Sequence, residues 1–421
     1  MLIKNGKLLL EKDFEYHDLV IRGGRIAEIL PYRSGCRDSE VYDAQGSVVI
    51  PGLIDLEVHG AMGFDLSDAC SEAYEAVGSY LIRHGVTSYI GAIDSFEDEI
   101  LSEAYAAAGD WMKEERPGAR MLGLNMRGPF LNPAQAAYHN KEALKLPDIE
   151  LYRKYQALSG GGIRIVNISP ELEGAQKFVL ALCDEVIIAM SNTAADFDTA
   201  RWGYAWKARW CADLFRNMPV FSLTDPGLIG ASMDIANFVT LRYDNDEYIH
   251  PSLLRMAFNE FWGRLALVSG MTAYTGLPAG SYEIEGHIVT KRRDRAKFED
   301  GTDAGSVLSL DACMSAIMFL AICVERLSAR LCEMSVSESS SMRMATGSRT
   351  SFSMTLRFSS DHPLRFWMNG CTMAVRRSSS CSSFFWTSEP TRTLYSSMST
   401  DSESKSITTL SPSTQSSAPM S

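Results

Sequence analysis

The chain has 421 residues, of which 46% are hydrophobic and 22% are charged, and its formal net charge is −12. These proportions are typical of a globular protein with one large α/β domain and a smaller second domain. The acidic balance excludes a general nucleic-acid binder, whose binding surface is basic. The nine cysteines are scattered without a CxxC pair, and the late apolar run "ACMSAIMFLAICV" is too short to span a bilayer. We therefore expect a cytoplasmic protein with neither a nucleic-acid nor a membrane partner.

Residues 1–50 predict a small antiparallel sheet. Apolar and polar residues alternate in "MLIKNGKLLL", "DLVIRGGRIAEIL" and "SVVIPG", and turns such as "RGGR" separate the runs. We assign this segment to a small sheet domain separate from the rest of the chain.

Residues 51–280 predict a parallel (β/α)8 barrel. Short apolar runs such as "GLIDLEV", "TSYIGAI", "MLGLNM", "IRIVNIS" and "FVTLRY" alternate with helix-length segments such as "SEAYEAVGSYLIRHG". About eight repeats of this alternation are typical of a TIM-like barrel, in which catalytic groups lie at the C-terminal ends of the strands.

The remainder of the chain changes character twice. Residues 281–315 read as strands that return to the small domain, whereas residues 325–421 are serine-rich and keep no periodicity. A disordered tail would explain the serines, but Trp367 and Trp386 are residues that such tails avoid. A frame-shifted or misread coding sequence would explain both features, and the two explanations remain open.

A series of motifs within residues 1–315 resembles the amidohydrolase superfamily. "PGLIDLEVHGAMGFD" is similar to the first barrel strand of that superfamily, and "GLNMRGPFLNPAQAAYHN", "ISPELEG", "DLFRNM", "DPGLIGASMD" and "YIHP" follow in the order found in N-acetylglucosamine-6-phosphate deacetylases. The resemblance implies a (β/α)8 barrel, a small β-sandwich that is built from both chain ends and has residues 1–50 as its N-terminal part, and a homodimer. It also implies a divalent metal, zinc or iron, that activates water to cleave the acetamide of an amino-sugar phosphate.

The resemblance also shows which ligand positions are substituted. The main metal-binding glutamate corresponds to Arg127, two ligand histidines correspond to Met190 and Asp213, and the catalytic aspartate corresponds to Gly270. Arginine repels a cation and offers no lone pair, a thioether suits hard metal sites poorly, and glycine moves no proton. We therefore expect no competent catalytic residue and no bound metal.

Three side chains remain candidate metal ligands, namely Glu57, His59 and Asp213. Members of the family that use a second metal carry His-x-His where this chain has Glu57-Val58-His59. The alternative for His59 is a barrel histidine whose hydrogen bonds are satisfied internally.

A buried Arg127 requires anionic partners, because an unpaired buried charge costs several kcal/mol. Our hypothesis is that its guanidinium lies where the metal cation would lie, between Glu57 and Asp213. The alternative is that Arg127 extends to solvent.

Four residues are candidates for substrate binding. Thr224 occupies the position of a phosphate-binding arginine and Tyr248 that of a sugar-contacting histidine, while His139 and Asn217 remain at positions that could contact the sugar. The alternatives are a surface-loop histidine for His139 and a turn or capping residue for Asn217. We expect Glu171 of "SPELEG" to be structural.

Three functions follow from these observations. The first is an active amidohydrolase that deacetylates an N-acetyl amino-sugar phosphate. The second is a non-catalytic barrel that binds such a sugar phosphate or a partner protein, and the third is a decayed or misread gene product. The substituted ligands favour the second and third.

Overall fold

The computed structural model of the chain describes residues 1–10, 13–137, 139–244, 248–284 and 287–318, together with five short strands between residues 355 and 384. Two compact units are distinguished, Met1–Gly52 with Glu338–Ser402, and Leu53–Ser337 with Glu403–Ser421.

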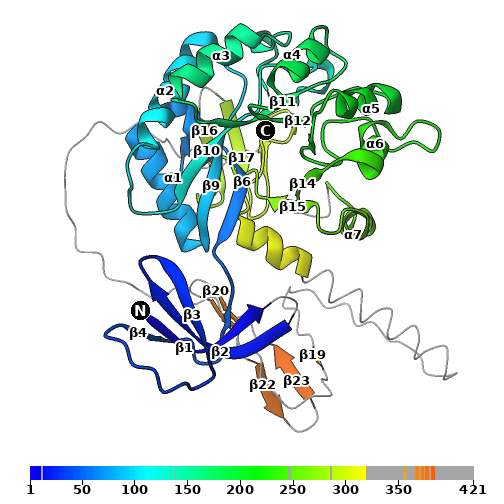
Figure 1. Ribbon diagram of the computed structural model, residues 1–421. Helices are drawn as coiled ribbons and strands as arrows, with labels where there is room; N and C mark the ends of the chain where they lie inside the picture. Colours follow the sequence, from blue (N-terminus) through cyan, green and yellow to red (C-terminus); the bar gives the residue numbers. More distant parts are fainter. Residues whose placement is uncertain are drawn as a thin grey trace, which may run out of the picture. The chain divides into compact units, whose positions relative to one another are not determined.

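The second unit contains a barrel of eight parallel strands, which confirms the predicted fold (Figure 1). In spatial and chain order the strands are β6 (Leu53–Val58), β9 (Val86–Ile93), β10 (Arg120–Met126), β11 (Ile163–Ile168), β12 (Ile187–Met190), β13 (Trp210–Cys211), β14 (Phe238–Arg242) and β15 (Leu265–Val268). A parallel bridge between Val58 and Met271 nearly closes the ring. The two-residue strand β13 is the one that the sequence pattern did not show.

Seven α-helices of the described chain connect these strands. They are α1 (Ser71–Arg83), α2 (Asp98–Trp111), α3 (Ile149–Leu158), α4 (Ala175–Leu182), α5 (Phe197–Ala205), α6 (Gly227–Ile235) and α7 (Pro251–Glu260). Aspartates fix two of the helix starts: Asp148 accepts from the backbone N–H of Glu150, and Asp196 from that of Thr199, each at 2.8 Å.

Short elements occupy the loops at the barrel rim. They are the strands β7 (Gly60–Ala61) and β8 (Phe64–Asp65) and the 3₁₀ turns η1 (Leu66–Asp68), η2 (Pro133–Gln135) and η3 (Lys141–Ala143).

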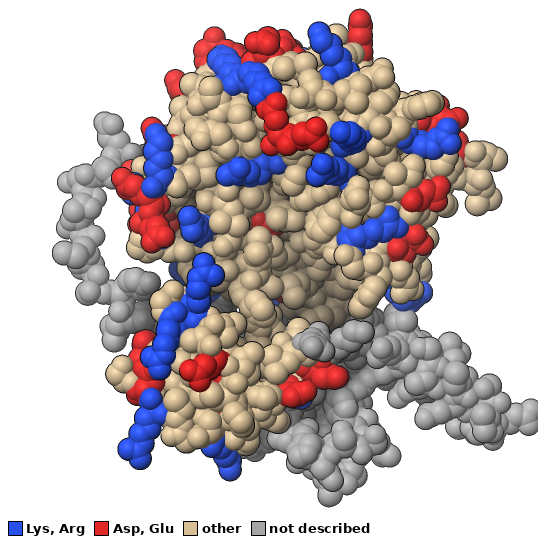
Figure 2. Space-filling view, viewed as in Figure 1, with Lys and Arg blue, Asp and Glu red and all other residues tan. Residues whose placement is uncertain are grey.

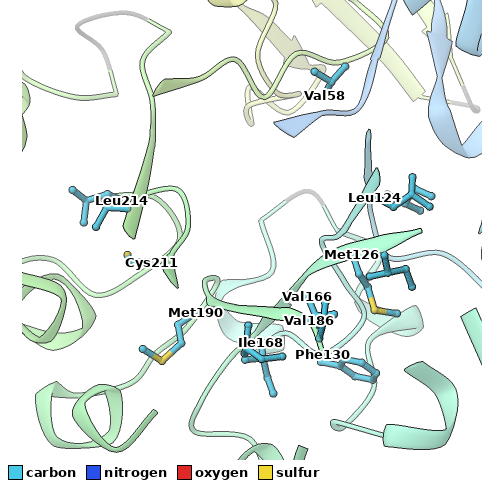
Figure 3. Packing of buried hydrophobic residues seen from close by; sticks show 14 of the residues in the cluster. Val58, Leu124, Met126, Phe130, Val166, Ile168, Val186, Met190, Cys211 and Leu214 are labelled. Atoms are coloured by element: carbon cyan, nitrogen blue, oxygen red, sulfur yellow. The ribbon is translucent and has the colours of Figure 1, made fainter. Parts of the chain in front are cut away.

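The largest apolar cluster of the described chain packs the barrel strands against their helices, and a smaller cluster of Ile90, Ile165, Ala189 and Ala212 is separate from it. Figure 3 shows side chains from neighbouring strands, among them Met126 of β10, Val166 and Ile168 of β11, and Met190 of β12. All four are fully buried. This core fixes the strand ends that carry the candidate site.

The N-terminal unit contains the strands β1 (Leu2–Leu10), β2 (Asp13–Arg22), β3 (Arg25–Pro31), β4 (Val41–Asp43) and β5 (Val48–Val49). The predicted antiparallel pairing is confirmed for β1, β2 and β3. It is wrong for β4 and β5, which run parallel to β1. The reason is the connection after β3, residues 32–40, which returns the chain to the other side of β1 before β4 begins.

The strands after the barrel differ from the expected return to the N-terminal sheet. Among the described strands, β16 (Gly280–Ile284), β17 (His287–Lys291) and β18 (Ala296–Phe298) pair with one another as a separate antiparallel sheet. Their buried Tyr282 and Val289 pack with Tyr274 and Val307, so this sheet has its own apolar cluster. Residues 310–318 are helical rather than extended.

In the C-terminal region the described residues form β19 (Thr355–Leu356), β20 (Phe366–Met368), β21 (Cys371–Met373), β22 (Val375–Ser378) and β23 (Cys381–Phe384). Most of residues 325–421 lie outside the described part of the chain. The disordered or frame-shifted tail therefore stays a prediction.

The visible surface carries charges of both signs. On the face in Figure 2, Lys and Arg side chains alternate with Asp and Glu side chains over the barrel rather than gathering into one basic patch. Among the described residues, no helix combines the length and apolar character needed to cross a membrane.

Candidate functional site

Arg127 lies in the barrel interior, at the C-terminal end of β10. Its Nη1 is 3.5 Å from Glu57 Oε2, and its Nη2 is 3.2 Å from Asp213 Oδ2. The side chain is 1% exposed, so it does not extend to solvent. The expected contacts with both carboxylates are therefore confirmed. Arg127 also donates from Nη1 to Asn167 Oδ1 at 3.3 Å.

A second buried arginine, Arg242, was missed by the sequence analysis. It ends β14, its side chain is 1% exposed, and its Nη2 lies 3.4 Å from the same Oδ2 of Asp213. Burial would raise the pKa of Asp213, but Arg242 and Arg127 outweigh burial and lower it. The signal was present in "FVTLRY", where a charged residue closes an apolar strand.

Gly270 lies against Arg242. The backbone of Gly270 has a φ of +55°, and a Cβ there would lie 2.5 Å from Arg242 Cδ and 2.7 Å from Arg242 Nη1. A side chain at position 270 and the present position of Arg242 are therefore incompatible. Its backbone N–H donates to the carbonyl of Glu57 at 3.0 Å, which joins the two ends of the barrel sheet.

His59 and His139 both lie beside Asp94, a residue that the sequence analysis also missed. His59 Nδ1 is 2.9 Å from Asp94 Oδ2, and His139 Nδ1 is 3.7 Å from Asp94 Oδ1. Burial would raise the pKa of Asp94, but the charges of His59, His139 and Arg127 lower it below its usual value. Burial lowers the pKa of His139 to about 4, so this histidine is neutral at pH 7 and carries its charge only in the acid range, where Asp94 itself titrates. His139 is buried, so the alternative that it is a surface-loop histidine is wrong.

The remaining family position, Met190, does not direct its side chain toward Arg127. Met190 ends β12, and its Sδ packs against Gly203 of α5, on the helix side of the strand. The neighbouring Ser191 donates instead to Asn167 Oδ1 at 3.0 Å. Asn167 thus links β11 to Arg127 and to the residue after β12.

The remaining substrate-binding candidates, Thr224, Asn217 and Tyr248, each have different neighbours. Thr224 is exposed beside Ser222. Asn217 has a φ of +50°, and its carbonyl accepts from the N–H of Thr193 at 3.0 Å, a geometry that favours the turn interpretation. The ring of Tyr248 lies 4.5 Å from the guanidinium of Arg216. Their roles in substrate binding stay predictions.

Arg216 is held by two acidic side chains. It forms ion pairs with Asp244 and, at 3.4 Å, with Asp303. Asp303 follows the β16–β18 sheet, so this pair ties that sheet to the barrel within the same unit. Two neighbouring carboxylates already balance the charge of Arg216, which makes it a poor anion receptor.

Glu171 makes the internal hydrogen bonds that a structural role predicts. Its Oε1 accepts from Asn132 Nδ2 at 2.7 Å and from the N–H of Ala194 at 2.6 Å, and its Oε2 accepts from Thr193 Oγ1 at 2.5 Å. These bonds join the loops that follow β10, β11 and β12.

The donor set at the barrel centre does not fit a divalent metal. The guanidinium of Arg127 occupies the space between Glu57 and Asp213, and it is a permanent cation without a lone pair. In the described part of the chain, no three or more His, Cys, Asp or Glu side chains are arranged to hold a metal ion. The interior charges are balanced by ion pairs within the protein.

Comparisons with known proteins point to one family. No profile of a known protein family matches the chain. An N-acetylglucosamine-6-phosphate deacetylase of Bacillus subtilis is 32% identical over 322 residues, which cover 74% of this chain and 80% of that protein. An N-acetylgalactosamine-6-phosphate deacetylase of Escherichia coli O157:H7 is 25% identical and covers 74% of this chain and 82% of its own length.

Solved structures agree on the fold. The crystal structure of an N-acetyl-D-glucosamine-6-phosphate deacetylase from Mycobacterium smegmatis has a TM-score of 0.68 at 22% identity and covers 77% of this chain and 84% of its own. One from Pasteurella multocida has the same TM-score at 21% identity, over 73% of this chain and 81% of its own.

Proposed function

Because this chain belongs to the N-acetylglucosamine-6-phosphate deacetylase family of the amidohydrolase superfamily, we propose that it is a member of that family that does not catalyse metal-dependent deacetylation. The observation that carries the proposal is the buried guanidinium of Arg127 between Glu57 and Asp213. A divalent cation in the same space would face a fixed positive charge.

The chemistry of amide hydrolysis supports this proposal. A metal-activated water needs several ligands, an open coordination position and a group that moves a proton. The remaining donors are already engaged: Glu57 and Asp213 with Arg127, and His59 with Asp94. Gly270 offers no acid or base. The side chains of Glu57, His59 and Asp213 are at most 2% exposed, so substrate does not reach them in this conformation.

The ligand class that we propose comes from the relatives. Their names describe deacetylases of N-acetylated hexosamine 6-phosphates. We propose that this chain binds the same class without hydrolysing it. A partner-binding barrel and a product without function are the alternatives, because Thr224 replaces the phosphate-binding arginine expected from the family.

An acetate-release assay tests the loss of catalysis. The purified protein is incubated with N-acetylglucosamine 6-phosphate and added Zn²⁺ or Fe²⁺, with the Bacillus subtilis relative as the positive control. We expect acetate release at the background rate and much less than one bound metal per chain by mass spectrometry. Stoichiometric metal with chelator-sensitive acetate release would contradict the proposal.

Calorimetric titration tests the ligand. N-acetylglucosamine 6-phosphate is titrated into the protein, and N-acetylglucosamine without phosphate is the control. We expect binding of the phosphorylated sugar alone. Absence of binding would leave a partner-binding barrel or a gene product without function, and re-reading the nucleotide sequence beyond codon 315 in the other frames would then test for a frameshift.

A further inference from the structure

One carboxylate oxygen at the barrel centre serves two arginines. Asp213 Oδ2 lies 3.2 Å from Arg127 Nη2 and 3.4 Å from Arg242 Nη2, and all three side chains are 1% exposed. Loss of one partner from a buried ion pair leaves an uncompensated charge, which is strongly destabilising. With two cations on one carboxylate, the effect of losing either depends on the presence of the other.

Two of the three ion pairs, Arg127 with Glu57 and Arg127 with Asp213, connect strands that are not neighbours, whereas Asp213 and Arg242 belong to the adjacent strands β13 and β14. Glu57 lies on β6 and Arg127 follows β10, with β9 between these strands. Asp213 follows β13, which is separated from β10 by β11 and β12. Arg242 ends β14. The four side chains therefore cross the barrel interior, whereas backbone hydrogen bonds join only adjacent strands.

We infer that Glu57, Arg127, Asp213 and Arg242 form an internal ion brace that holds the C-terminal end of the barrel together without a metal. This inference concerns folding stability, so it goes beyond the proposed function. A chain that bound sugar phosphate, or one that bound nothing, would need the same brace.

The brace also accounts for the glycine at position 270. Arg242 reaches Asp213 by passing along the space that a side chain at position 270 would fill, as the 2.5 Å separation of its Cδ from a Cβ there shows. The residues at positions 127, 242 and 270 therefore depend on one another. A carboxylate at position 127 would leave Arg242 as the one cation beside Asp213, and a side chain at position 270 would clash with Arg242.

Thermal unfolding of the full chain tests the brace through a double-mutant cycle. Arg127→Met and Arg242→Met each remove a charge and keep most of the side-chain volume. We expect each to lower the unfolding midpoint by about 5 °C or more, and the double variant to lower it by more than the sum. Adding Asp213→Asn to the double variant should restore part of the loss, because it removes the unpaired anion.

The control for the cycle is Arg153→Met. Arg153 is exposed and pairs with Glu185 on the surface, so its replacement should shift the midpoint by about 2 °C or less. Arg127→Lys keeps the charge but loses the contact of two guanidinium nitrogens with two carboxylates. Its unfolding midpoint should lie between those of the wild type and Arg127→Met. Additive single effects no larger than that of Arg153→Met would overturn the inference.

A chelator experiment on the unaltered protein covers the case in which the variants do not fold. Excess EDTA should leave the unfolding midpoint unchanged, and added Zn²⁺ should not raise it. A midpoint that falls with EDTA would overturn the brace. Neither the unfolding of the variants nor the chelator experiment depends on binding of sugar phosphate. A wrong inference about the brace can therefore be distinguished from a wrong proposal about the function.

Discussion

In the barrel, β9 and β11 bury residues on both faces, whereas in the N-terminal sheet β3 exposes six of its seven residues. The barrel core joins several tens of side chains into one cluster. The N-terminal sheet buries only five apolar residues within Met1–Gly52, namely Leu2, Leu8, Leu19, Val20 and Ala44. This difference teaches that apolar packing contributes far more to the barrel than to the described part of the N-terminal sheet, so each unit should respond to a different kind of mutation.

The largest expected effect is a cavity in the barrel core. Leu81 of α1 is fully buried, so Leu81→Ala should lower the free energy of unfolding by about 2–5 kcal/mol. The neighbouring Ile82 is 42% exposed, and Ile82→Ala is the matched control with a much smaller effect. Denaturant unfolding followed by tryptophan fluorescence measures both. Equal effects would show that the barrel is not packed as described.

The next effect concerns the close approach of Gly270 to Arg242. Gly270→Ala should lower the free energy of unfolding by about 2–3 kcal/mol, because the left-handed backbone and the clash with Arg242 both oppose a side chain there. Gly263→Ala is the control, because Gly263 has a φ of +77° and open space around it, so it reports the backbone cost alone. In an Arg242→Ala background the excess cost of Gly270→Ala should disappear. Persistence of that excess would contradict the geometry.

A smaller effect is expected from Asp18 in the N-terminal sheet. Its carboxylate accepts from the N–H groups of Asn5 and Ser34 and from the Ser34 hydroxyl, at 3.0–3.1 Å. Burial would raise the pKa of Asp18, but these hydrogen bonds outweigh burial and lower it. Asp18→Asn should lower the free energy of unfolding by about 1–2 kcal/mol at pH 7. Asp13 is exposed, so Asp13→Asn should change that free energy little.

The same carboxyl makes the sheet sensitive to acid. Because the folded pKa of Asp18 lies below the unfolded value near 3.8, its contribution is present above that value and is lost as the pH falls toward the folded pKa. Hydrogen exchange of the β1 and β2 amides from pH 7 to pH 3 should show this loss in wild type. The loss should be absent in Asp18→Asn.

The smallest effect is expected at the edge of the sheet. Ile26 of β3 is 61% exposed, so Ile26→Thr should change stability by about 0.5 kcal/mol or less. Val20, which is 2% exposed, provides the contrast within the same sheet through Val20→Ala. A large loss from Ile26→Thr, measured by hydrogen exchange, would mean that another surface covers β3.

Much of this architecture could be predicted from the sequence, because buried parallel strands are continuous apolar runs. β13 could not, since Trp210–Cys211 is too short to show a period. The contacts of Arg127 followed from charge balance together with the family resemblance: a buried cation needs anions, and Glu57 and Asp213 occupy positions of the family's metal-ligand set. Arg242 and Asp94 were not found, because no pattern shows which strand ends meet across a barrel.

The orientation of Met190 could not be predicted either. A strand end can direct its last side chain into the barrel or toward the helices, and the packing of Met190 on Gly203 decides this. The position matches the family motif while the side chain lies on the other face of the strand. Motif alignment alone would therefore count Met190 as a broken ligand rather than as part of the core.

The hydrogen bonds of Glu171 have a consequence for how the barrel could admit a ligand. Since one carboxylate ties together the loops after β10, β11 and β12, that half of the rim is expected to move as a single body. The segment after β13 is tied to that body at two points, where Asn217 accepts from the N–H of Thr193 and where Asp225 accepts from the N–H of Phe197. Leu223 lies between these points and is 99% exposed, so any opening motion should begin at this tip rather than in the loops that Glu171 joins.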